Sequence, residues 1–252
     1  MRKLIVLAAL CSPMATAEVI SVDAHSLMRL PGKASVVQLE RLEVADYGTL
    51  LIPSNLTEIN VGELRLGHEA RIAIVPGEKE LRLHAQRAQL GTGSQIMARG
   101  APGTHLKPAL PGRNLDLQLQ SLSAQELSID ARGGAGAPGY AGLDGGNGEA
   151  AGCTWGQAGK GADGDNGGDG HSGAAGAQVR LQVPRNFPGE QIKVRVEGGA
   201  GGVAGAPGKA GAGGASKGCL VYRAEGGRSG QPGAPGQPGV AGAAGSVSVQ
   251  RL

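Results

Sequence analysis

Aromatic residues are scarce in this chain of 252 residues, which has one tryptophan, three tyrosines and one phenylalanine. Cysteine is also rare, with three residues, one of them near the start. After residue 17, no apolar stretch approaches the ~20 residues that a membrane-spanning helix needs. We therefore expect no membrane span.

Residues 1–17 have the pattern of a secretory signal peptide. Arg2 and Lys3 precede the apolar run from Leu4 to Leu10, and an A-x-A cleavage site follows at 15–17. Removing Arg2 and Lys3 changes 24 basic against 21 acidic residues to 22 against 21. The nearly neutral mature chain gives no argument for nucleic-acid binding. We expect an exported bacterial surface protein that is located in the periplasm, at the cell surface or outside the cell.

No set of residues predicts an enzyme or a cofactor site. The five histidines lack metal-ligand spacing, and no Ser/His/Asp or paired-carboxylate site can be assembled. The G-x-G-x-x-G match at 134–139 is an accident of a triplet repeat, because no βαβ unit surrounds it.

What the chain has in abundance is glycine, and 37 of its 47 glycines lie between residues 133 and 245. Glycine returns every third residue in four runs: 133–148, 161–176, 199–214 and 227–245. Adding 66 to Gly133, Cys153 and Gly161 gives Gly199, Cys219 and Gly227. The segment is a tandem duplication with copies at 133–198 and 199–252, which contain β-rich tails at 178–183 and 246–250.

A three-residue period leaves one face of a polyproline II helix without side chains. A collagen triple helix needs long unbroken repeats rich in proline, whereas each run here is short and interrupted by loops. The pattern therefore favours one chain folded back on itself, with bare glycine faces in contact. At roughly 3.1 Å per residue, each run would be a rod about 50 Å long.

Residues 133–245 thus resemble the glycine-rich polyproline II bundles of the snow flea antifreeze proteins and the receptor-binding tips of T-even phage tail-fibre adhesins. The resemblance rests on period and loop layout. It implies a polyproline II helix bundle, with adhesion or ice binding as possible functions.

Residues 18–132 have a different repeat. Residues 42–52 align with 64–74, and looser copies follow at 88–98 and 119–129. Each copy reads as strand, turn and strand, at intervals of 22 to 31 residues. This period predicts a β-solenoid-like domain, with an antiparallel sandwich as the alternative. The expected fold class is mainly β plus polyproline II, in two domains divided at residues 132 and 133.

Cys153 and Cys219 occupy equivalent loops of the two copies, and we expect them to form a disulfide in an oxidising compartment. Two free thiols or an intermolecular bridge are the alternatives. Trp155 and Tyr222 follow closely, with Lys217 and Arg223 nearby, so these four residues are the candidate binding residues. Packing of the two rings over the disulfide, as a small end core, is the other interpretation.

Asp163, Asp165 and Asp169 make the second run acidic and are weak candidates for calcium binding. They do not keep one position in the triplet, so a solvated acidic surface is the preferred interpretation and we expect no metal.

The sequence predicts an exported, non-enzymatic structural or adhesive protein that presents loop tips to a surface, matrix, protein or glycan partner. Ice binding is one alternative, suggested by short side chains such as Ala204, Ala206, Ala210 and Ala212. A glycan-binding module on the amino-terminal repeats is another.

Overall fold

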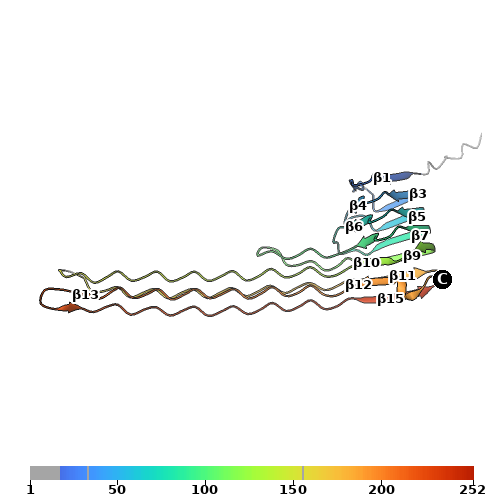
Figure 1. Cartoon of the computed structure of the whole chain (residues 1–252). Helices are drawn as coiled ribbons and strands as arrows, with labels where there is room; N and C mark the ends of the chain where they lie inside the picture. Colours follow the sequence, from blue (N-terminus) through green and yellow to red (C-terminus); the bar gives the residue numbers. More distant parts are fainter. Residues whose placement is uncertain (1–17, 33, 155) are drawn as a thin grey trace, which may run out of the picture.

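A β-rich base carries long glycine segments that project to one side of the molecule (Figure 1). The computed structural model describes residues 18–252 except Lys33 and Trp155, so the predicted signal peptide lies outside the described residues. The carboxyl terminus lies in the base, at the end away from the projecting segments.

Two parallel sheets form the base. The first sheet contains, in spatial order, β1 (Val19–Val22), β3 (Val36–Val44), β5 (Glu58–Leu66), β7 (Leu81–Leu90), β9 (Leu115–Ala124), β11 (Gln178–Val183) and β15 (Ser246–Arg251). The second contains β12 (Ile192–Arg195), β10 (Leu127–Asp130), β8 (Gln95–Met97), β6 (Arg71–Ile74), β4 (Thr49–Ile52) and β2 (Leu27–Arg29). A hairpin of β13 (Lys217–Gly218) and β14 (Arg223–Ala224) lies at the far end of the glycine segments.

One apolar core joins the two sheets, because side chains alternate in and out along each strand. The chain passes from the first sheet to the second through stacked tight turns. His25, Tyr47 and Glu69 have positive φ in three of these turns, and Gly93 takes that place in the next. A left-handed conformation at one fixed position lets each repeat follow the same path.

The predicted strand–turn–strand repeat is confirmed for its first three copies. Leu42 pairs with Leu64, and Leu64 pairs with Ala88. The fourth copy is shifted, since Ala88 pairs with Leu122 and not with Leu119. The predicted tails at 178–183 and 246–250 are strands β11 and β15.

The rest of the predicted fold class is wrong. The regular structure consists of parallel sheets of seven and six strands, and the only helix among the described residues is the 3₁₀ turn η1 (Gly189–Gln191). A polyproline II helix bundle and a β-solenoid are therefore not supported. The resemblance to the antifreeze and tail-fibre proteins and the collagen-like description are not supported either.

The prediction of a helix bundle failed because a glycine at every third residue shows which face of a segment lacks side chains, but does not specify which segments pair. β11 pairs with β9 and β12 pairs with β10, so both sheets continue from the first half of the chain into the glycine-rich half. The division at residues 132 and 133 stays a prediction.

Four extended segments, here called rods 1 to 4, correspond to residues 133–148, 161–176, 199–214 and 227–245. Their glycine N–H groups donate to carbonyl oxygens of adjacent rods at every third residue. Rod 1 donates to rod 3, rod 2 to rod 4, rod 3 to rod 2 and rod 4 to rod 3. In the middle of the assembly, Gly205 N donates to Gly168 O (2.9 Å), and Gly205 O accepts from Gly236 N (3.1 Å).

Arg113 is fully buried at the place where the chain returns to the base and enters β9. Its guanidinium donates to the carbonyl oxygens of Lys79 (2.9 Å), Pro53 (3.2 Å) and Leu56. Burial lowers the pKa of Arg113. The side chain thereby ties together the turns that precede β5 and β7.

Asp130 lies where β10 leads into rod 1. Arg132 donates two hydrogen bonds to its carboxylate (2.9 and 2.8 Å), and Arg99 lies 3.7 Å away. Burial raises the pKa of Asp130, but the bonds from Arg132 and the two positive charges outweigh this effect, so the pKa lies below its ordinary value. The ionised carboxylate thus stabilises the junction.

Replacing Gly205 with alanine tests the close approach of the rods. An added Cβ would meet the carbonyl oxygen of Tyr140, and we expect Gly205→Ala to lower the free energy of unfolding by about 2 kcal/mol, as overpacking does. Gly146→Ala is the matched control, because nothing lies within 4 Å of its added Cβ. Urea denaturation followed by circular dichroism measures both, and equal effects of the two variants would contradict the close packing.

Asp130→Asn should make stability less dependent on pH. A carboxyl with a lowered folded pKa stabilises the fold above its unfolded pKa, and this stabilisation is lost as pH falls through the folded pKa. At neutral pH we expect the variant to be less stable by about 1 kcal/mol, since solvent screens partly exposed pairs. Urea midpoints from pH 7 down to pH 2 should converge for the two proteins, and a constant gap would argue against the ion pair as the cause.

Candidate functional site

The distal end of the rods is the first candidate site. Cys153, between rods 1 and 2, and Cys219, between rods 3 and 4, are joined by a disulfide with an S–S distance of 2.08 Å. Tyr222 Oη donates to Cys153 O (2.6 Å), which adds a second link between the two loops. The two halves of the glycine-rich segment are thus connected at the end farthest from the base.

A tight hairpin forms the outermost part of this end. β13 pairs with β14 in antiparallel register, and Cys219 N donates to Tyr222 O (2.8 Å). Leu220 and Val221 are left at the turn with relative exposures of 105% and 93%. These two exposed aliphatic side chains form an apolar tip, called here the hairpin tip.

Three of the four predicted binding residues lie in this hairpin. Tyr222 is half exposed, Lys217 lies in β13, and Arg223 in β14 donates to Ser216 Oγ (3.1 Å). Trp155 lies outside the described residues. The sequence-based prediction considered aromatic and basic side chains and missed Leu220 and Val221. Two apolar residues directly after a cysteine in a polar loop could have indicated an exposed apolar contact.

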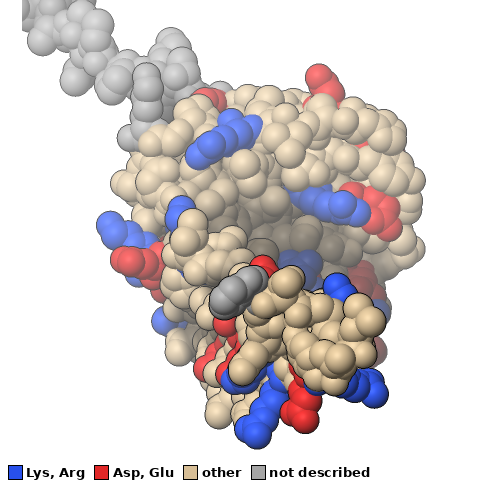
Figure 2. All heavy atoms as spheres, turned by 90° about the vertical axis from the view of Figure 1, so that its left-hand side faces the viewer, with Lys and Arg blue, Asp and Glu red and all other residues tan. Residues whose placement is uncertain are grey.

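The surface around the hairpin tip has no single sign of charge. Seen from the distal end, lysine and arginine side chains are interspersed with aspartate and glutamate, and most of the surface belongs to other residues (Figure 2). A cleft of about 500 Å³ lies beside Tyr222, lined by residues of both disulfide-linked loops. This end is suited to contacts that depend on shape and apolar area more than on charge.

Two of the three acidic residues of rod 2 have a structural role, and the third, Asp165, is exposed. Asp163 and Asp169 each accept a hydrogen bond from a backbone N–H of rod 4, on Gln231 (2.8 Å) and Gln237 (2.7 Å). Asn166 does the same between them, toward Ala234 (2.7 Å). These three residues keep one position in the triplet, whereas Asp165 occupies another. Within residues 18–252 as described, no group of three or more His, Cys, Asp or Glu side chains could hold a metal ion.

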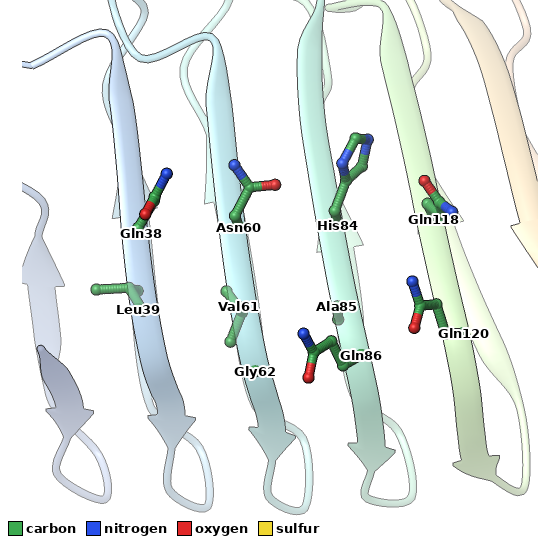
Figure 3. A pocket seen from close by; sticks show the side chains of 10 residues that line it. All are labelled: Gln38, Leu39, Asn60, Val61, Gly62, His84, Ala85, Gln86, Gln118 and Gln120. Carbon is green, nitrogen blue, oxygen red and sulfur yellow. The ribbon is translucent and has the colours of Figure 1, made fainter. Parts of the chain in front are cut away.

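The second candidate site is a polar hollow on the outer face of the seven-stranded sheet, here called the amide trough. Gln38, Asn60, His84 and Gln118 come from β3, β5, β7 and β9 and lie side by side in one row. Figure 3 shows these four side chains in line, with Gln86 and Gln120 in a second row. The hollow has a volume of about 350 Å³.

A break in side-chain alternation shapes the trough. In β7 the neighbours Gln86 and Arg87 are both exposed, and in β9 Gln120 and Ser121 are. Two consecutive outward residues bend a strand, as a bulge does. Gly62 stands at this place in β5 and has no side chain to fill the hollow.

The first row continues beyond the hollow, because Gln118 pairs with Gln182 of β11 and Gln182 pairs with Gln250 of β15. Six neutral hydrogen-bonding side chains therefore occupy one register position on six strands. Sequence reasoning missed this row. The sequence feature that could have revealed the row is a Gln, Asn or His two residues before the break in alternation in each of β3, β5, β7 and β9.

Charged side chains of both signs border the trough. Past the break, Glu63 accepts from Arg41 (2.9 Å) and lies 2.7 Å from Arg65. The hydrogen bond from Arg65 lowers the pKa of Glu63, and its burial acts in the opposite direction more weakly. On the other side, Asn60 Nδ2 donates to Glu58 Oε1 (2.8 Å). Beside the amide row, Glu58, Arg82 and Asp116 follow one another in register, so the bordering charges alternate in sign.

The chain matches no protein-family model, no curated protein and no solved structure. The described part of the chain contains no helix long and apolar enough to cross a membrane.

Removing the disulfide should loosen the distal end without affecting the base. In Cys153→Ser/Cys219→Ser, we expect faster amide hydrogen exchange at residues 148–159 and 214–227, because the two loops lose their covalent link. Strands β5, β7 and β9 should exchange at wild-type rates. Unchanged exchange in the loops, or faster exchange throughout the base, would contradict a local role.

Proposed function

We propose that this chain is an exported, non-enzymatic adhesive protein whose β-sheet base holds out the glycine rods, with the hairpin tip as the contact surface. The observation that carries the proposal is the near-complete exposure of Leu220 and Val221 at the end of a covalently closed assembly. Exposed aliphatic side chains on a rigid support lose little conformational entropy when they bind, which favours recognition.

The rods supply the rigid support. Their backbone N–H groups bond between rods at every third residue, and the disulfide and the Tyr222 hydrogen bond close the far end. A run of 16 extended residues spans about 50 Å. This length separates the contact surface from the base, as an adhesive projection requires.

Ice binding, the alternative suggested by the alanines of rod 3, stays a prediction. Lys209 interrupts the alanine positions, and its backbone N–H is bonded to Asp144 of rod 1 (2.7 Å). The side chains that project from the rods include Tyr140, Leu143, Val203 and Val240, which do not form one uniform face.

A direct test immobilises the purified protein through a carboxyl-terminal tag, since that terminus lies in the base and leaves the tips pointing outward. Adhesion is measured by single-molecule force spectroscopy against methyl-terminated and hydroxyl-terminated monolayers. We expect binding to the methyl surface to fall at least tenfold in Leu220→Ser/Val221→Ser, since burying one aliphatic side chain contributes about 1.5–3 kcal/mol.

The matched control is Val203→Ser/Val240→Ser, which removes two exposed valines from rods 3 and 4 away from the tip. This control should adhere like the wild type. If the two double variants lose adhesion equally, or if the tip variant keeps it, the hairpin tip is not the contact surface.

A further inference from the structure

The row of amides on the outer sheet face has the chemistry of a ligand site. Each glutamine or asparagine side chain offers two N–H donors and a carbonyl acceptor, and a hydroxyl group offers one donor and two acceptors. Gln38, Gln86 and Gln120 are exposed, while Asn60, His84 and Gln118 are half-buried. Such a surface matches a ligand that carries many hydroxyl groups.

The geometry requires a ligand that is long and repetitive. The first row crosses six strands, from Gln38 to Gln250, at a strand spacing of about 4.8 Å. A small molecule would use only one or two of these positions. A chain lying across the strands would meet an equivalent group at each strand.

The charge pattern requires a ligand that is neutral. The charged residues that follow one another across the strands alternate in sign on both sides of the trough: Glu58, Arg82, Asp116 and Arg180 on one side, and Arg41, Glu63 and Arg87 on the other. Without an uncompensated basic stripe, the phosphates of a nucleic acid or the carboxylates of an acidic glycan find no counter-charge.

We propose that the amide trough binds a single chain of a neutral polysaccharide across strands β3, β5, β7 and β9. Hydroxyl groups of successive sugars bond to Gln38, Asn60, His84 and Gln118, and Gln86 and Gln120 contact the same chain from the second row. The inference is independent of the hairpin tip. It gives the base its own attachment, at the opposite end of the molecule from the adhesive contact.

Affinity electrophoresis of the full chain tests the proposal, in native gels that contain dextran, mannan or a mixed-linkage β-glucan, with polygalacturonate as the acidic comparison. We expect retardation by at least one neutral polysaccharide and none by polygalacturonate. In His84→Ala/Gln118→Ala, the apparent dissociation constant should rise at least about tenfold, because both central partners in the row are lost.

Gln89→Ala/Ser123→Ala is the matched control, since it removes exposed polar groups from the same two strands beyond the break. It should bind within about twofold of the wild type, and so should the tip variant Leu220→Ser/Val221→Ser. Circular dichroism melts show whether each variant is folded, and Gln120→Ala provides a milder second trough variant with a smaller loss.

The proposal is overturned if no neutral polysaccharide retards the wild type, if polygalacturonate retards it more, or if the trough and control variants bind alike. Loss of adhesion in the tip variant with intact polysaccharide binding would separate the two sites. Loss of polysaccharide binding in the tip variant would instead move the glycan site to the hairpin.

Discussion

The fold of the distal half depends on the close approach of backbones that only glycine permits. At the repeating glycines of the four rods, an added Cβ would meet a carbonyl group of another rod. The same approach places N–H groups within bonding distance of carbonyl oxygens, so a segment with almost no apolar core satisfies its backbone through lateral hydrogen bonds. Side chains contribute where the backbone falls short, as Asp163, Asn166 and Asp169 do toward rod 4.

The sequence predicted those parts of the fold that depend on regular residue spacing. Alternation located the second halves of the long strands, and the 66-residue offset placed Cys153 and Cys219 in equivalent loops. The first halves of β3, β5, β7 and β9 were missed, because the alternation breaks in the middle of each strand. The same break misaligned the fourth repeat and hid the amide row. These failures share one cause, since a strand was expected to keep its period of two throughout.

The helix bundle was a wrong inference for another reason. A triplet of glycines constrains which faces are bare, whereas the pairing of β11 with β9 and of β12 with β10 depends on contacts between distant parts of the chain. These contacts add strands from the glycine-rich half to both sheets of the base. The candidate site at the tip was located through its cysteines. Its most exposed residues, Leu220 and Val221, were missed because the prediction considered only aromatic and basic side chains.

The orientation of the lateral bonds has a mechanical consequence. The N–H···O bonds between rods lie across the rod axis, so a pull on the hairpin along that axis loads them in shear. In shear, many bonds resist together, and separation requires a row of them to break at once. The disulfide between residues 153 and 219 distributes the same tension over all four rods and back into both sheets. A glycine repeat that gives almost no hydrophobic stabilisation can in this way transmit force along its length.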